Sequence, residues 1–261
     1  MPLVSVLWGI ALLAVIATTV MDATGTSRKL ADNGLYAAEA DAMAEAAIVR
    51  AAIGLSDPAP GTGWRADGRP RQFELRKWRA VVRIQDELGR IDLNFADQDL
   101  LFGLLRSVGS EPQKATALAL SIIEWRMMPV PGVSANGWPQ RRLFHAVNEL
   151  LLVPGISQDL FARIEPALTV YSQRPTFDPQ LAPLEALLAL PGATRDQVAQ
   201  ALARRAQDTL GIAPSLKGRA FSLAIEATDG SHKRAYRAAI RFTDDRAKPY
   251  WLLDFQIVSK S

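Results

Sequence analysis

Residues 2–20 read Pro2-Leu-Val-Ser-Val-Leu-Trp-Gly-Ile-Ala-Leu-Leu-Ala-Val-Ile-Ala-Thr-Thr-Val20, and this stretch is the most informative feature of the sequence. None of the first 21 residues carries a charged side chain. As an α-helix rising about 1.5 Å per residue, the stretch spans roughly the 30 Å hydrocarbon core of a bilayer. We therefore expect a membrane helix, since a helix buried in a globular core is rarely so uniform. Its apolar positions are Leu3, Val4, Val6, Leu7, Trp8, Ile10, Leu12, Leu13, Val15, Ile16 and Val20.

A cleavable secretory signal is the alternative to a retained membrane helix. Such a signal has a basic segment before the apolar run and a small-residue cleavage site after a shorter run. No Lys or Arg precedes the run in this sequence, and no convincing Ala-x-Ala site follows it. The sequence therefore favours a retained anchor.

The helix is expected to continue beyond the apolar stretch. Residues 37–53 are rich in alanine, which has the highest helix propensity, and no proline occurs between Asp22 and Leu55. A helix over residues 2–55 would be about 80 Å long, which exceeds both a bilayer and a small domain. We expect its first half to lie in lipid and its second half to pack against a folded domain. Residues 56–63 contain two prolines and two glycines, which end the helix.

The remaining chain predicts strands on both sides of a helical block. Apolar and polar residues alternate over 72–84, which predicts one strand or two, and in three stretches between residues 220 and 258, where Asp229-Gly230 indicates a hairpin turn. Residues 96–208 instead follow a helical period, with helices expected over 143–152 and 158–168 among others. This order predicts an α+β fold in which a small antiparallel sheet packs on the long helix and is interrupted by a large inserted all-α domain. The predicted units are the helix over 1–55, the first part of the sheet over 56–95, the helical domain over 96–213 and the closing strands over 214–261.

Composition excludes several kinds of chemistry. The 261-residue chain has no cysteine, which removes disulfides, thiolate metal sites and cysteine nucleophiles. Its two histidines, His145 and His232, fall in different regions and are interpreted as ordinary surface residues, and no HExxH, GxSxG or phosphate-binding glycine motif occurs. The formal net charge of +3 is too small to indicate nucleic acid. We therefore expect no enzyme activity, no cofactor and no metal.

Neighbouring carboxylates have structural explanations. Residues 86–87 and 244–245 are acidic pairs at predicted turns, where solvation is the expected state. Asp97 and Asp99 follow Asn94, which we interpret as the N-cap of a leucine-rich helix, and acids in a first turn favour the positive end of the helix. None of these groups therefore predicts catalysis.

Two Pro-Gly turns, Pro154-Gly155 and Pro191-Gly192, join helical segments and resemble helix–hairpin–helix elements. Backbone N–H groups in such turns can bind DNA phosphates. A DNA-binding turn should carry lysine or arginine in or just after the turn, but Ile-Ser-Gln-Asp follows the first turn and Ala-Thr-Arg-Asp the second. We therefore favour compact helix–helix turns and expect no nucleic-acid partner. A membrane-anchored helix–hairpin–helix DNA-binding protein is kept as an alternative.

The most specific element of the chain is Asp86-Glu-Leu-Gly-Arg-Ile-Asp-Leu-Asn94. It is one of a series of motifs that together extend over nearly the whole chain. The others are the apolar N-terminal run, the alanine-rich tract, Ile122-Ile-Glu-Trp-Arg126, Asn148-Glu-Leu-Leu-Leu-Val-Pro-Gly155 and Thr169-Val-Tyr-Ser172. In these stretches the chain resembles the K-type minor pseudopilins of bacterial type II secretion systems (the general secretion pathway protein K family). The residues that carry the family motifs are Asp86, Glu87, Gly89, Ile91, Asp92, Asn94, Trp125, Pro154 and Gly155.

The resemblance implies a pilin-like fold and a role in assembly rather than catalysis. It places the chain at the tip of a periplasmic pseudopilus, in a complex with the I-type and J-type minor pseudopilins that initiates assembly and supports export across the outer membrane. The implied partners include the inner-membrane assembly platform, and contact with the outer-membrane channel or secreted cargo is left open. The implied location is the inner membrane, crossed once, with most of the chain in the periplasm. A minor pilin of a related type IV pilus system is a further alternative.

The sequence departs from the family pattern at two places. Most pilin-like chains carry glutamate at mature position 5; if Met1 is the mature first residue, this chain has Ser5 there, and the K-type family also lacks that acid. The family's short basic leader is missing, so either the sequence is already mature, with Met1 as the processed, N-methylated residue, or the start is misassigned. K-type relatives can bind calcium through acids after the Trp-Arg element, where this chain reads Arg126-Met-Met-Pro-Val-Pro131. Calcium prefers oxygen ligands, which methionine cannot supply. We therefore expect no calcium site.

Overall fold

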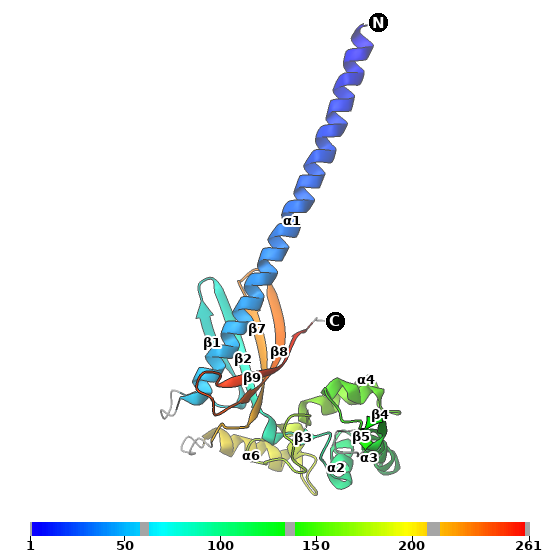
Figure 1. The fold of residues 1–261 in the computed structure, drawn as a ribbon, viewed down its shortest axis with the longest axis vertical. Helices are drawn as coiled ribbons and strands as arrows, with labels where there is room; N and C mark the ends of the chain where they lie inside the picture. The colour runs from blue at the N-terminus through cyan, green and yellow to red at the C-terminus, as the bar shows by residue number, and fades with distance from the viewer. Residues whose placement is uncertain (1, 58–62, 134–138, 208–214, 259–261) are drawn as a thin grey trace.

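The computed structural model describes the backbone of residues 2–57, 63–133, 139–207 and 215–258. Side chains are described for Trp8 and for residues 30–57, 63–129, 141–205 and 215–258. Figure 1 shows three parts: a long helix, a sheet packed on its C-terminal half, and a helical domain beside the sheet.

Helix α1 runs over 55 residues, from Pro2 to Ser56, and its N-terminal half projects far beyond the sheet (Figure 1). The predicted end of the helix after residue 55 is confirmed. Apart from Trp8, which is 75% exposed, the side chains of the predicted membrane positions lie outside the described residues. Within the residues that are described, no helix combines the length and the apolar character needed to cross a membrane.

A five-stranded antiparallel sheet in the order β1-β2-β7-β8-β9 lies against α1. Of the two alternatives for residues 72–84, the structure has two strands, which form a hairpin that turns at Arg76. The predicted turn at Asp229-Gly230 joins β7 to β8, with Gly230 at a φ of 96°. The strands are β1 (Asp67–Leu75), β2 (Trp78–Asp86), β7 (Ala220–Thr228), β8 (Lys233–Phe242) and β9 (Tyr250–Val258).

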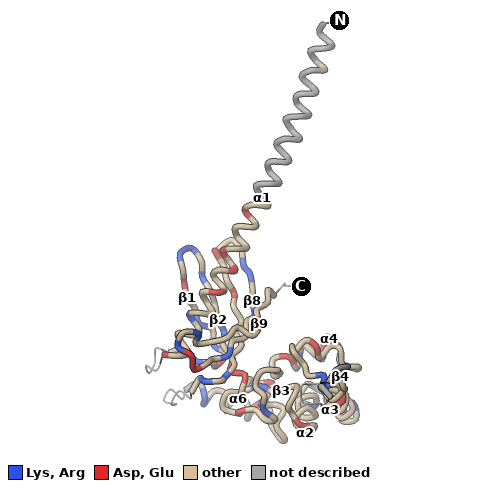
Figure 2. Tube along the Cα trace, in the orientation of Figure 1, with Lys and Arg blue, Asp and Glu red and all other residues tan. Residues whose placement is uncertain are grey.

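The contact between α1 and the sheet depends on small residues. Ala40, Ala44, Ala47 and Ala51 recur at helical spacing and are each 0% exposed, so the helix backbone approaches the strands closely. Ion pairs border this contact, because α1 carries acidic residues where it passes the sheet and the strands carry basic ones (Figure 2). The apolar side chains under the helix include Val82, Ile84, Leu223, Ile225 and Tyr236.

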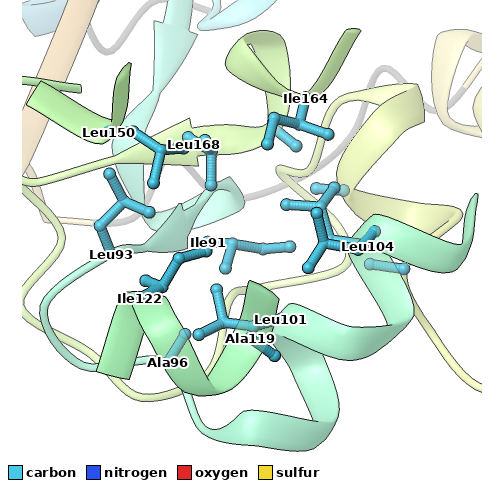
Figure 3. Close-up of a cluster of buried hydrophobic side chains, with 14 of the residues drawn as sticks. Ile91, Leu93, Ala96, Leu101, Leu104, Ala119, Ile122, Leu150, Ile164 and Leu168 are labelled. Atoms are coloured by element: carbon cyan, nitrogen blue, oxygen red, sulfur yellow. The ribbon is translucent and has the colours of Figure 1, made fainter. Parts of the chain in front are cut away.

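The chain leaves the sheet after β2 and returns at β7, although these two strands are neighbours. The segment between them forms a second, separate core around Ile91, Leu101 and Ile122 (Figure 3). Its elements are η1 (Glu87–Gly89), β3 (Ile91–Asp92), α2 (Gln98–Ser107), α3 (Pro112–Met127), β4 (Pro129–Val133), β5 (Pro139–Arg141), η2 (Val147–Leu152), α4 (Gln158–Ile164), η3 (Glu165–Ala167), β6 (Leu168–Thr169), α5 (Leu184–Leu187) and α6 (Arg195–Gln207).

Two helices of this segment are shorter than the sequence pattern predicts. The helix expected over 143–152 is only a 3-10 turn over Val147–Leu152. The helix expected over 158–168 ends at Ile164, because Pro166 lacks the N–H that would continue it. The following residues instead form β6, which pairs in parallel with β3. The predicted α+β class, a long helix on an antiparallel sheet with helices inserted between strands, is confirmed.

Candidate functional site

The two ends of the inserted segment meet at a buried ion pair. Asp86 is the last residue of β2, and its carboxylate accepts a hydrogen bond from the Leu88 N–H at 2.9 Å and pairs with the guanidinium of Arg219. Burial raises the pKa of Asp86, and the charge of Arg219 opposes this shift. The prediction that residues 86–87 are solvated was therefore wrong. Both are buried, and Glu87 pairs with Arg90 at 3.2 Å.

Gly89 allows the junction to pack closely. A Cβ atom at this position would lie 2.2 Å from the carbonyl oxygen of Leu181, which no larger residue can accept without a backbone shift. The Leu181 carbonyl also accepts a hydrogen bond from the Gln85 side chain at 2.8 Å. The family-motif glycine is thus explained by a close approach between two distant chain segments.

Asp92 joins two further motif segments. Its carboxylate accepts hydrogen bonds from the N–H of Asn94 at 2.9 Å, the N–H of Gln173 at 2.8 Å and the hydroxyl of Ser172 at 3.1 Å. The side chain is buried, and this burial raises its pKa, although the hydrogen bonds favour the charged form. Ile91 is buried in the same strand. Residues 91–94 therefore lie beside the Thr169–Ser172 motif.

Asn94 is not the N-cap of the leucine-rich helix. Asp97 holds that position and accepts from the Leu100 N–H at 2.8 Å, while Asp99 lies in the first turn as expected. The Asn94 amide instead donates to the Phe144 carbonyl at 2.9 Å and accepts from the Phe144 N–H at 2.8 Å. A side-chain amide can match a backbone amide in this way, and the geometry holds a distant loop in place.

The Trp125-Arg126 element lies in the last turn of α3 and contacts residues 93–96 and Arg142. Arg126 donates to the carbonyl oxygens of Leu93 at 2.8 Å and Ala96 at 2.7 Å. Trp125 is half-buried, and the Arg142 guanidinium lies 3.8 Å above its ring. These contacts give the element a structural role. Of the described residues, no group of three or more carboxylate, histidine or cysteine side chains could hold a metal ion.

The Pro-Gly turns pack inside the helical domain. Gly155 has a φ of 90°, and a Cβ atom there would lie 2.8 Å from the Leu118 side chain. Gly192 also has a positive φ, 72°. Pro154 precedes the first of these glycines, and the two turns connect η2 to α4 and α5 to α6. Conformation and packing thus account for the first turn.

A polar cavity of about 290 Å³ lies where the sheet meets the inserted segment. Two of the arginines that line it are engaged: Arg219 pairs with Asp86, and Arg241 donates to the carbonyls of Gly218 at 2.9 Å and Tyr171 at 2.8 Å. Burial raises the pKa of Tyr171 to about 12, so its hydroxyl is protonated at neutral pH. The cavity therefore contains groups that stabilise the junction rather than a poised nucleophile.

The remaining predicted residues lie elsewhere. Met1 and the side chains of the membrane positions, except for that of Trp8, lie outside the described residues. His145 and His232 are exposed, and the ring of His232 packs 4.6 Å from that of Tyr36. Sequence reasoning missed Arg219, whose only local signal is its place directly before the strand β7.

The architecture defines a class of protein. A long projecting helix packed on an antiparallel sheet, with further elements inserted between neighbouring strands, is a pilin-like α+β arrangement. No family model matches the chain, and no curated protein matches it. Among solved structures, the fold is shared with a chain of the crystal structure of the GspK-GspI-GspJ complex from the type 2 secretion system of enterotoxigenic Escherichia coli. The identity is 16% and the TM-score 0.53, over 91% of this chain and 99% of that chain.

Proposed function

We propose that the chain is a K-type minor pseudopilin at the tip of a type II secretion pseudopilus. The observation that carries this proposal is the shared fold, which extends over 91% of this chain and 99% of a chain of the GspK-GspI-GspJ complex. The order of family motifs, from the N-terminal apolar run to Thr169–Ser172, supports it independently. In this role the chain forms contacts and catalyses no reaction.

The proposed partners are the I-type and J-type minor pseudopilins, together with the inner-membrane assembly platform. The projecting half of α1 offers them a long surface, and Leu30 and Leu35 are exposed on it at 67% and 62%. Exposed apolar side chains on a helix favour burial against other helices. We propose that this helix initiates pseudopilus assembly by packing against partner helices, and that the complex supports export across the outer membrane.

The proposed location is the inner membrane, which the chain crosses once, with most of its residues in the periplasm. The charge-free stretch over residues 2–21 supports this location, because it is long enough to span the hydrocarbon core. Before assembly the apolar side chains would be buried in lipid and afterwards against neighbouring helices. Met1 would be the processed and N-methylated residue.

The decisive experiment is co-purification from membranes. The full chain, expressed with the I-type and J-type pseudopilins of its own organism, should be recovered with both in one complex after detergent extraction. Mass analysis of its N-terminus should find a methylated Met1. Failure to recover either partner would contradict the proposal, as would DNA binding that weakens steeply with salt.

A further inference from the structure

Three segments of the inserted domain meet at the end of α3 and leave apolar side chains exposed. The hydrogen bonds described above hold residues 93–96, 125–128 and 142–144 together, and the N–H of Arg142 donates to the Met128 carbonyl at 3.0 Å. The exposed apolar side chains of these segments, here called the methionine patch, are Phe95 (44%), Met127 (49%), Met128 (45%) and Leu143 (42%).

Arginine accompanies the methionine patch. The guanidinium of Arg142 lies 3.8 Å from the Trp125 ring centroid, so stacking restrains it and leaves its N–H edge for a carboxylate. Arg141 is exposed next to it. Among the residues that the structure describes, neither arginine forms an ion pair, and the nearby Arg126 adds a further positive charge.

Three acidic side chains lie near these arginines in the chain or in space. The Asp97 carboxylate caps α2, and the Glu149 carboxylate accepts from the His145 N–H at 3.0 Å. Glu124 is exposed on α3. None of the three pairs with Arg141 or Arg142 in the described part of the chain, so both guanidinium groups are available to a carboxylate of a partner beside an apolar surface.

We propose that the methionine patch, with Arg141 and Arg142, binds an acidic and apolar segment of another protein. Tryptophan, arginine, methionine and phenylalanine are the residues enriched where protein interfaces gain most of their affinity. Methionine side chains adapt to differently shaped apolar groups, and the arginines select for negative charge. The surface therefore discriminates by charge more than by shape.

The methionine patch lies away from the sheet and from α1. Strands β4 and β5, which follow and precede its segments, lie on the side of the inserted domain turned away from the sheet and from α1 (Figure 1). Basic residues lie beside β4 in the same region (Figure 2). A partner could bind here while α1 is engaged in an assembly, so the inference does not rest on the proposed function.

Two labelled peptides test the proposal on the full chain in detergent. The first is an amphipathic peptide of Leu, Phe and Glu, and the second has Lys in place of every Glu. Fluorescence anisotropy should show saturable binding of the acidic peptide, with an affinity that falls as salt rises, because salt screens exposed charges. Binding of the Lys peptide should be at least about tenfold weaker. Equal binding of the two peptides would overturn the proposal.

Variants separate the contribution of charge from that of shape. The double substitution Arg141→Glu and Arg142→Glu should weaken acidic-peptide binding about tenfold or more. Arg142→Lys keeps the charge but loses the planar stacking group, so a smaller loss is expected. Met127→Ser should weaken binding without changing its salt dependence. The matched control is the double substitution Arg195→Glu and Arg204→Glu on α6, at two exposed arginines outside the patch.

Circular dichroism of each variant establishes that it is folded before binding is compared. The proposal is overturned if the double charge reversal binds the acidic peptide as the wild type does. It is also overturned if the Arg195→Glu and Arg204→Glu control loses as much affinity as the double variant in the patch, because the effect would then reflect net charge alone. The salt dependence and peptide preference of the unaltered chain decide the matter even if a variant does not fold.

Discussion

Asp86 and Arg219 form an ion pair whose side chains are only 1% and 11% exposed, and this pair joins the two ends of the inserted segment. Asp86 ends β2, and Arg219 directly precedes β7, which is the neighbour of β2 in the sheet. The inserted segment thus begins and ends at this one contact. The placement of the helical domain against the sheet depends on a pair that water hardly reaches.

Removing one partner of this pair should destabilise the protein strongly. Arg219→Met leaves the Asp86 carboxylate buried without its counter-charge, which typically lowers the free energy of unfolding by about 3–5 kcal/mol. Lys217→Met is the control, because it removes an exposed pair with Asp244 that contributes little. Urea unfolding followed by near-ultraviolet circular dichroism compares the two. Equal midpoints for both variants would contradict a structural role for the buried pair.

Substitution of glycine by alanine should have opposite effects at Gly89 and Gly34. At Gly89 the new Cβ atom meets the Leu181 carbonyl oxygen at 2.2 Å, so the junction must open and the free energy of unfolding should fall by about 2 kcal/mol or more. At Gly34, in α1, nothing lies within 4 Å of the new atom, and alanine favours the helix by up to about 1 kcal/mol. Thermal unfolding of both variants measures the contrast, and a tolerated Gly89→Ala would show that the approach is loose.

The periodicity of the sequence predicts the elements well because it is a local property. Alternation over 72–84 and 220–258 locates strands, and the prolines and glycines of residues 56–63 locate the end of α1, without reference to any distant residue. The fold class follows from the order of these elements. Helix lengths in the inserted domain were predicted less well, since Pro166 breaks a pattern that is otherwise helical.

Partners of polar residues could not be predicted in the same way. Asp86 stands at a turn, which usually means solvation, and its burial depends on Arg219, which lies 133 residues away in the chain. Asn94 and Asp97 are both suitable N-caps by residue type. The contact between Asn94 and Phe144, 50 residues apart, decides between them. Long-range contacts of this kind leave no local trace in the sequence.

The different roles of Asn94 and Asp97 can be measured. Asn94→Ala removes two hydrogen bonds to the backbone of Phe144, whose side chain is buried, and should lower the free energy of unfolding by about 2 kcal/mol. Asp97→Ala removes one exposed cap and should cost about 1 kcal/mol. Chemical denaturation of the two variants under the same conditions gives both values. A larger loss for Asp97→Ala would show that the Asp97 cap stabilises the protein more than the contacts of Asn94 with Phe144.

A charge in the apolar stretch should prevent membrane insertion if the proposed location is correct. Leu12→Arg should cost about 3 kcal/mol in the bilayer. Leu30→Arg is the matched control, because Leu30 lies beyond the apolar stretch and is 67% exposed. Carbonate extraction of membranes separates inserted from released chain. Equal membrane retention of the two variants would contradict the anchor.

Asp92 should make the stability depend on pH in an identifiable direction. Its pKa is raised above the ordinary value of 3.8 by burial, so from about pH 4 up to the folded-state pKa the folded state holds more protons than the unfolded state. The free energy of unfolding must then decrease as pH rises through this range. Asp86, whose pKa is also raised, contributes in the same direction.

The substitution Asp92→Asn removes one titrating group, so stability should fall less steeply with rising pH than in the wild type. The substitution also places an amide where the carboxylate accepts hydrogen bonds. This loss lowers the free energy of unfolding by a similar amount at every pH, so it does not contribute to the change in slope. Asp244→Asn provides a control of opposite sign, because a hydrogen bond from Lys217 lowers the pKa of Asp244 and its contribution is lost as pH falls. Urea titrations between pH 4 and pH 7 compare the slopes of Asp92→Asn and the wild type, and titrations below about pH 4 measure that of Asp244→Asn, because its lowered pKa places its titration there. An unchanged slope in Asp92→Asn would mean that the hydrogen bonds from residues 94, 172 and 173 outweigh burial, and that the carboxylate stays charged throughout the higher of these pH ranges.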